Sequence, residues 1–174
     1  MLDTKIESAL NQQINAELWS SYLYLSMSCD MDNKGFEGIS SWFSIQSREE
    51  YLHAERLMKF IGNRNGKVTL MPIQEVKQEW NTPTEAFEDT LKHEKIVTGL
   101  VNNLVEMAMQ AKDFATQNMM KWFVDEQVEE ESNVHKILDK LKKINNDPVG
   151  LYSLDQQLGQ RQLVVPPQAG PGQV

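Results

Sequence analysis

The sequence predicts an all-α protein: a four-helix bundle with a long crossover between helices 2 and 3 and a short fifth C-terminal helix. Glycine and proline are almost absent from three long stretches of the 174 residues. Apolar side chains recur in those stretches at helical spacing. About twenty residues, 62–81, separate the second stretch from the third, and that is enough chain to cross the length of a bundle.

Turn residues bound the first two helices. The first is predicted over about residues 3–32 and ends in an Asp-Asn-Lys-Gly turn at residues 32–35. The second is predicted over about residues 36–61 and stops at Gly-Asn-Arg-Asn-Gly, residues 62–66. Between these turns nothing interrupts the helical pattern.

The third stretch holds two helices. Thr82 can cap its start, Pro83 takes the first helical position and Glu85 completes a capping box. Only one glycine interrupts the pattern before an Asn-Asn-Asp-Pro turn, but the apolar stripe changes register on the way. This slip predicts a break within residues 109–114, with Asp113 as the cap of the following helix.

The crossover lets the second and third helices run parallel. A 25-residue helix is about 38 Å long, and twenty extended residues reach about 66 Å. A short fifth helix is predicted from Asp147-Pro148 to Leu158. We therefore expect one domain over residues 1–158, followed by a Pro/Gly-rich tail over residues 159–174 to which we assign no role.

Composition excludes several classes of function. The chain carries 25 Asp and Glu against 17 Lys and Arg, a formal charge of −8, and so lacks the basic surplus of a nucleic-acid binder. The single cysteine, Cys29, excludes an intrachain disulfide and any paired-cysteine metal motif. No apolar run approaches the roughly 20 residues of a membrane span, and the N-terminus starts no secretory segment, so we expect no membrane partner and a cytoplasmic location.

The inward stripe of every long helix is apolar at its ends and polar near its middle. A four-three step along the second helix, for example, begins at Ile39 and ends at Phe60 with charged residues between them. The polar residues on the four stripes include Glu17 and Tyr24 in the first helix, Glu50 and His53 in the second, Glu94 in the third, and Gln127 and Glu130 in the fourth.

Glu50 and His53 form a Glu-x-x-His motif whose spacing places both side chains on one helix face. The motif alone is common on exposed helices, and Glu17, Glu94 or Glu130 alone would be a solvated residue. Their joint position predicts a di-metal site, because four buried glutamates cannot all stay ionised without a cation. Carboxylates with one imidazole favour iron or manganese, and Glu50 is the natural ligand for two ions to share.

Four further residues could serve this site. Tyr24 lies two turns from Glu17 and is either a half-buried core tyrosine or a partner of the site. Glu49, Glu126 and Glu129 are each offset from a stripe by one position. Such residues normally form a solvated face, but here they could hold another ion beside the first site.

With these residues in view, the chain closely resembles the bacterial non-haem ferritins over residues 1–158. The resemblance implies a ferroxidase that oxidises Fe(II) with dioxygen or hydrogen peroxide. It also implies deposition of ferric oxyhydroxide inside a hollow octahedral cage of 24 chains, with the fifth helix lining one class of channel. The motifs that carry it are Gln-Gln-Ile-Asn-Ala-Glu (12–17), Ser-Ser-Tyr-Leu-Tyr-Leu (20–25), Glu-Glu-Tyr-Leu-His-Ala-Glu (49–55) and Glu-Gln-Val-Glu-Glu-Glu (126–131).

The resemblance also implies which residues bind iron. All of them come from one chain, and Glu50 is shared by two ions. Tyr24 would lie beside the centre. The implied ligands are Glu17, Glu50 and His53 for the first iron, Glu50, Glu94 and Glu130 for the second with Gln127 close to it, and Glu49, Glu126, Glu129 and Glu130 for a third.

Related classes fit less well. Bacterioferritins carry a second Glu-x-x-His where this chain has Gln127 and Glu130, and a haem-binding methionine where it has Tyr51, so we expect no haem. Another ferritin-like di-iron oxidoreductase is one alternative, but a rubrerythrin-like peroxidase needs paired cysteines and an oxygenase usually needs a larger chain. A DNA-protecting mini-ferritin is the other, but that class lacks the fifth helix and builds its metal site between subunits.

Overall fold

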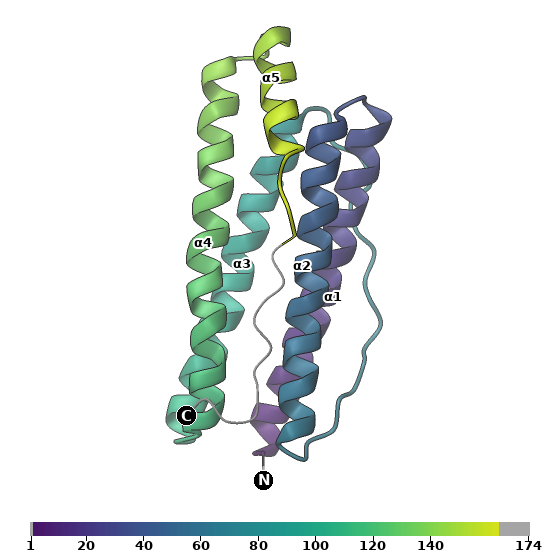
Figure 1. The fold of residues 1–174 in the computed structure, drawn as a ribbon. Coiled ribbons are helices and arrows are strands. Elements are labelled where there is room, and N and C mark those ends of the chain that lie inside the picture. Colours follow the sequence, from purple (N-terminus) through teal and green to yellow (C-terminus); the bar gives the residue numbers. More distant parts are fainter. Residues whose placement is uncertain (1, 164–174) are drawn as a thin grey trace.

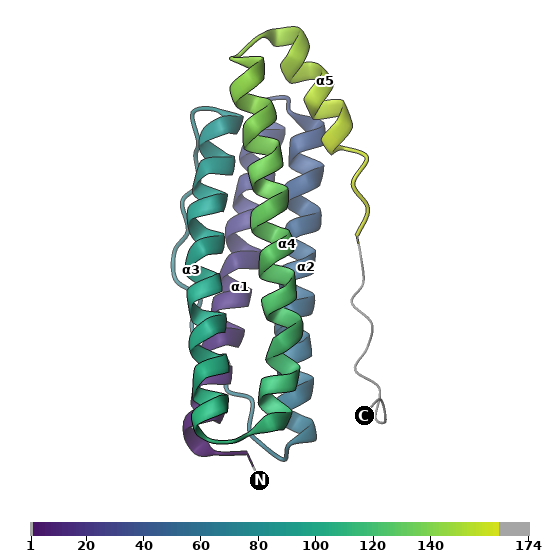
Figure 2. The same cartoon turned by 90° about the vertical axis from the view of Figure 1, so that its left-hand side faces the viewer.

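The computed structural model describes residues 2–163, which form five helices and no strand (Figure 1). The four long helices lie side by side, and α5 packs at one end against α2 and α4 (Figure 2). The predicted all-α class and the short fifth helix are confirmed. Most of the predicted tail, residues 164–174, lies outside the described residues. The helices are α1 (Thr4–Asn33), α2 (Glu37–Asn63), α3 (Pro83–Gln110), α4 (Phe114–Ile144) and α5 (Pro148–Leu158).

Side-chain caps fix the starts of α3 and α4 as the sequence predicts. The Thr82 hydroxyl accepts a hydrogen bond from the Glu85 amide at 3.1 Å, and Asp113 caps α4 in the same way. One detail of the predicted capping box is wrong. The Glu85 carboxylate accepts the amide of Asn81 at 2.8 Å instead of the Thr82 amide, because its other oxygen is held by Lys77 of the crossover.

The start of α2 is capped from a distant part of the chain. Its N-cap residue, Phe36, has no side chain that can accept a hydrogen bond. Asp155 of α5 replaces this cap: its carboxylate accepts the amides of Gly38 at 3.1 Å and Ile39 at 2.8 Å. The approach requires glycine, since a Cβ on residue 38 would lie 1.8 Å from the Asp155 carbonyl oxygen. This contact attaches α5 to the bundle.

The crossover runs from the end of α2 back along α1 to the start of α3 (Figure 1). Its backbone is held by polar side chains of α1. Asn11 donates to the Lys67 carbonyl at 3.0 Å, and Ser26 donates to the Lys77 carbonyl at 2.8 Å. As a result α2 and α3 run parallel, as predicted. None of the five described helices has both the length and the apolarity that crossing a membrane requires.

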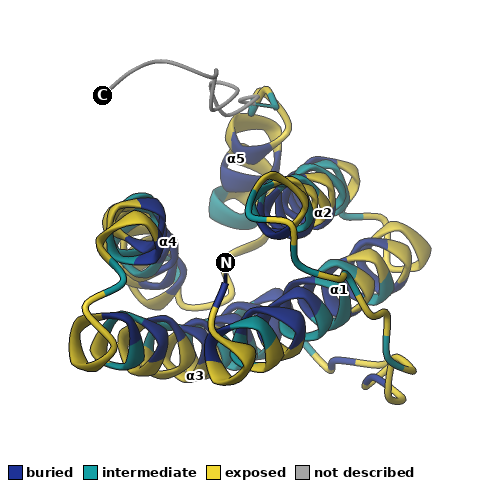
Figure 3. Ribbon diagram, turned by 90° about the horizontal axis from the view of Figure 1, so that it is seen from below, coloured by how far each residue is buried: buried dark blue, intermediate teal, exposed yellow. Residues whose placement is uncertain are grey.

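The apolar interior consists of two clusters, one at each end of the bundle. One lies beside α5 and includes Met27, Phe43 and Phe87, and the other lies at the opposite end and includes Leu57 and Phe123. Both are built from the helix faces that point inward (Figure 3). Between them lies a layer of buried polar residues from all four long helices.

The predicted stripe of α2 is wrong at its last position. Phe60 is only partly buried, whereas its neighbour Ile61 is completely buried. The four-three step has a period of 3.5 residues and the helix a period of 3.6, so the inward face drifts by about 20° per heptad. Over three heptads from Ile39, the drift is enough to bring the next residue inward.

Candidate metal centre

The layer between the two apolar clusters contains the predicted ligands. Each long helix contributes at least one buried carboxylate, and none of the six side chains is more than 5% exposed. They come from helical positions that point at the bundle axis. The six are Glu17 from α1, Glu50 and His53 from α2, Glu94 from α3, and Gln127 and Glu130 from α4.

Glu17, Glu50 and His53 form a close group of potential metal ligands. One ligand atom from each lies within 4.8 Å of the other two. His53 Nδ1 is 3.2 Å from Glu50 Oε2 and 3.9 Å from Glu17 Oε2. Two carboxylates and an imidazole at this separation can surround one divalent cation.

Two glutamine amides orient these carboxylates. Gln13 Nε2 donates to Glu17 Oε1 at 2.8 Å, and Gln46 Nε2 donates to Glu50 Oε1 at 3.0 Å. Both contacts join residues four apart on one helix, a spacing at which polar side chains meet. Neither glutamine was predicted to have a role, although the spacing of four residues can be seen in the sequence. Such outer partners fix the orientation of metal ligands.

Tyr24 and Gln127 bind the two different oxygens of the Glu94 carboxylate. The Tyr24 hydroxyl donates to Glu94 Oε1, and Gln127 Nε2 donates to Glu94 Oε2 at 3.0 Å. Tyr24 is completely buried, not half-buried, and its hydroxyl contacts a predicted ligand. Glu130 lies nearby, and its buried Oε2 atom has no hydrogen-bond partner within residues 2–163. Neither Glu94 nor Glu130 belongs to the close group of three.

Burial makes three carboxylates of this layer, those of Glu17, Glu94 and Glu130, retain protons. It raises the pKa of Glu17 to about 8 and that of Glu130 to about 7, and the charge of Glu50 adds to both shifts. The same two causes raise the pKa of Glu94 well above its ordinary 4.5. Without a cation, most of the negative charge of the site is therefore neutralised by protons.

Glu50 and His53 behave in the opposite way because they form a pair. Burial opposes the ionisation of both residues, but the charge of each favours the charged form of the other. The pKa of Glu50 is lowered, and that of His53 is raised from 6.5 to about 10. A protonated imidazole thus takes the place of a metal ion beside Glu50.

Trp122 packs against His53 of the close ligand group. Its ring meets His53 edge to face at 5.2 Å, and the Arg56 guanidinium lies 4.3 Å from the centroid of the Trp122 ring. This packing holds the imidazole ring against α4 and away from solvent.

The residues predicted for a third iron are more loosely arranged. Within residues 2–163, Glu49, Glu126 and Glu129 join no close group of ligands. Burial raises the pKa of Glu126, and the charges of Glu129 and Glu49 add to that shift although His53 opposes it. Glu49 is bound to Arg161, beyond the end of α5. Arg161 could not be predicted from the sequence, because a single basic residue in an irregular segment belongs to no motif.

Four helices that each supply a carboxylate to a shared buried layer define the class of helical-bundle proteins that bind metal ions through carboxylate ligands. Comparison with known proteins then gives the family. The Ferritin-like domain family matches residues 7–144. The chain belongs to the ferritin family, as its motifs predict.

Individual relatives cover nearly the whole chain. A bacterial non-haem ferritin of Bacteroides fragilis is 44% identical over 92% of this chain and 100% of its own. A bacterial non-haem ferritin of Staphylococcus aureus is 34% identical over 92% of this chain and 97% of its own. The crystal structure of an open-pore ferritin from Archaeoglobus fulgidus superposes with a TM-score of 0.92 at 46% identity, covering 93% of this chain and 100% of that one.

Proposed function

We propose that this protein is an iron-storage ferritin that oxidises Fe(II) at a di-iron ferroxidase centre within each chain. The observation that carries the proposal is the buried group of Glu17, Glu50 and His53 in the middle of the bundle. Fe(II) is the substrate, and dioxygen or hydrogen peroxide is the oxidant. The Fe(III) product leaves the centre and is deposited as ferric oxyhydroxide inside a protein cage.

The chemistry of the donors fits iron. Glu17, Glu50 and His53 would hold one Fe(II), and Glu50, Glu94 and Glu130 the second, with Gln127 beside it. Oxygen donors with one imidazole suit iron better than metals that prefer thiolates. Two Fe(II) ions together supply two electrons, which reduce dioxygen to hydrogen peroxide or hydrogen peroxide to water.

The protein contributes ligands in fixed positions, and it releases protons from these ligands when Fe(II) binds. Entering Fe(II) displaces the protons that Glu17, Glu94 and His53 hold when no cation is present. Tyr24 keeps Glu94 in position through its hydroxyl. The proposal includes no haem, because the residue that follows Glu50 is Tyr51 and not a methionine.

A third iron would bind beside the centre, between Glu49, Glu126, Glu129 and Glu130. The buried Oε2 atom of Glu130 supports this, since no described residue forms a hydrogen bond with it and Glu130 would also serve the second iron. A ligand with two oxygens can face both positions.

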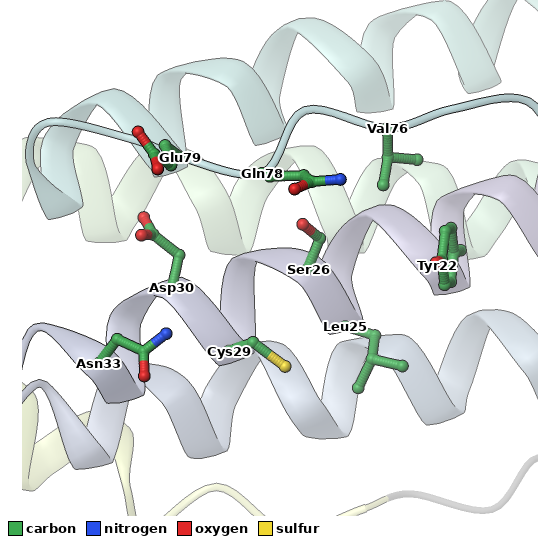
Figure 4. Close-up of a pocket in the computed structure, with 9 residues that line it drawn as sticks. All are labelled: Tyr22, Leu25, Ser26, Cys29, Asp30, Asn33, Val76, Gln78 and Glu79. Carbon is green, nitrogen blue, oxygen red and sulfur yellow. The ribbon is translucent and has the colours of Figure 1, made fainter.

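Self-assembly into an octahedral cage of 24 chains is the proposed quaternary structure. Support comes from large apolar residues exposed on the outer face of the bundle, among them Leu25 of α1 and Leu70 and Ile73 of the crossover. Between α1 and the crossover lies a cavity of about 480 Å³, lined in part by Tyr22, Leu25 and Val76 (Figure 4). Copies of this chain would cover this face in the cage, with α5 near a channel. The proposed location is the cytoplasm.

The two alternative functions lack support of this kind. A DNA-protecting mini-ferritin would need a metal site between subunits, whereas the close ligand group here lies within one chain. The chain also has the fifth helix that this class lacks. A rubrerythrin-type peroxidase would need paired cysteines, and Cys29 is the single cysteine of the chain.

Glu50→Ala tests the proposal, because it removes the ligand that two ions would share. We expect the initial rate of Fe(II) oxidation, followed by ferric absorbance, to fall by on the order of a hundredfold. Size-exclusion chromatography should show an assembly of unchanged size. Glu55→Ala is the matched control, since Glu55 lies on the same helix but is exposed. An unchanged oxidation rate in Glu50→Ala would exclude the assigned centre.

A further inference from the structure

Arg161 reaches from the segment after α5 onto the surface of α2. Its Nη2 atom donates to Glu49 Oε2, and its Nη1 atom donates to Gln46 Oε1 at 2.8 Å. The guanidinium carbon also lies 4.5 Å from the centroid of the Trp42 ring. The Arg161 side chain is 20% exposed, so these three contacts cover most of it. Two hydrogen bonds from a planar guanidinium that also stacks on an aromatic ring are contacts that arginine can make and lysine cannot.

The contacts connect Arg161 to the candidate metal centre. Gln46 accepts from Arg161 with its carbonyl oxygen and donates with its amide to Glu50 at 3.0 Å. Glu50 belongs to the close ligand group. The charge of Arg161 also acts on Glu130, whose pKa it lowers against the effect of burial. Arg161 therefore influences residues of both the second and the third proposed iron positions.

Glu49 and Glu130 are two of the four carboxylates proposed for the third iron, and they differ in the hydrogen bonding of their Oε2 atoms. The Oε2 atom of Glu130 is buried and has no hydrogen-bond partner in the described part of the chain, so it is available to a cation. The Oε2 atom of Glu49 is bound by Arg161. A metal ion that used this oxygen would meet the guanidinium at close range, and the two positive charges repel each other.

We propose that Arg161 is a built-in cation that occupies the third iron position, called the outer position below, through its contact with Glu49. A metal ion that binds at the outer position displaces Arg161. This inference rests on the proposed function, because it concerns the third iron position of the same centre. Residues 159–163 then act as a latch: attached to α2 when the outer position is free of metal, and released when it is filled. Linkage requires the effect to be reciprocal. The attached latch therefore lowers the affinity for the metal ion by the same factor by which the bound metal ion lowers the equilibrium constant for attachment of the latch.

The test uses the full-length, assembled protein freed of metal by a chelator. Zn²⁺ is titrated by isothermal calorimetry, because it binds carboxylate and imidazole ligands and undergoes no redox reaction. The binding step that disappears in Glu126→Gln is assigned to the outer position. Arg161→Gln is compared with Arg48→Gln, which removes the same charge from an exposed position on α2.

We expect Arg161→Gln to bind Zn²⁺ about tenfold more tightly in the outer step, because the competing cation is gone. Arg48→Gln should leave this step unchanged. Arg161→Lys keeps the charge but not the fork of donors, so its affinity should stay within about threefold of the wild type. In the wild type, Zn²⁺ should also increase hydrogen exchange at the amides of residues 160–163.

Two results would overturn the latch. One is an outer step of unchanged or weaker affinity in Arg161→Gln, and the other is exchange at residues 160–163 that does not respond to Zn²⁺. If the inner Zn²⁺ steps remain normal in either case, the proposed ferroxidase centre stands and only the latch fails. If the wild type binds no Zn²⁺ at all, both proposals fall together.

Discussion

Replacing Glu17 by glutamine should stabilise the metal-free protein at alkaline pH. The folded chain keeps the Glu17 carboxyl protonated up to a pKa of about 8, whereas the unfolded chain ionises it near 4.5. Because the folded state binds this proton more tightly, the associated stability is fully present below about pH 4.5 and is lost as the pH rises toward 8. The loss amounts to on the order of 4–5 kcal/mol, at about 1.4 kcal/mol for each pH unit.

Glutamine has the shape of a protonated glutamate and does not titrate. Its side-chain oxygen can still accept the hydrogen bond from Gln13, which Glu17 now accepts at 2.8 Å. The variant and the wild type should therefore be almost equally stable at pH 5. At pH 8.5 the variant should be more stable by about 4–5 kcal/mol, because the attraction between Glu17 and His53 is already contained in the pKa of about 8.

Urea unfolding of chelator-treated protein, followed by helical circular dichroism at both pH values, measures this difference. Protein concentrations must be equal, since assembly adds to apparent stability. Glu55→Gln on the exposed side of α2 is the control and should show no pH-dependent gain. An identical difference between Glu17→Gln and the wild type at pH 5 and pH 8.5 would refute the reasoning.

Two further predictions concern the attachment of α5 and the role of Tyr24. Gly38→Ala should destabilise the protein by about 2–4 kcal/mol in urea unfolding, because the new methyl group would displace Asp155 from the start of α2. Gly99→Ala is the matched control on α3; nothing lies near its Cβ position, so it should stabilise by about 0.5–1 kcal/mol, and equal losses in both variants would contradict the proposed contact. Tyr24→Phe removes the hydrogen bond to Glu94 and should weaken calorimetric Zn²⁺ binding at the second position by about 10–100-fold. Unaltered affinity would mean that Tyr24 serves only the core.

Local signals in the sequence were enough to predict most of the fold. Thr82 and Asp113 act on amides within three residues of themselves, so each cap could be read from its neighbours. The length of the crossover predicted the parallel arrangement of α2 and α3 by simple geometry. The cap of α2 was not predictable, because Asp155 lies 117 residues from Gly38 in the chain and no local pattern links them.

The same distinction applies to the candidate site. Buried carboxylates on apolar stripes can be recognised from the sequence alone, because helical periodicity fixes which residues share a face. Glu17, Glu50 and His53 were predicted in this way and lie together. Glu49 is different, since its state depends on Arg161, which the fold brings from the far end of the described chain.

The division of the interior into two apolar clusters has a consequence for how the bundle opens. Each end of the bundle buries its own core, and the layer between them holds protons and like charges instead of apolar contacts. We therefore expect the two ends of the metal-free chain to be coupled more weakly than they would be across one continuous apolar core. A pair of cations bound to all four helices would join the two ends. The cargo of the protein is then also the element that makes its two halves behave as a single body.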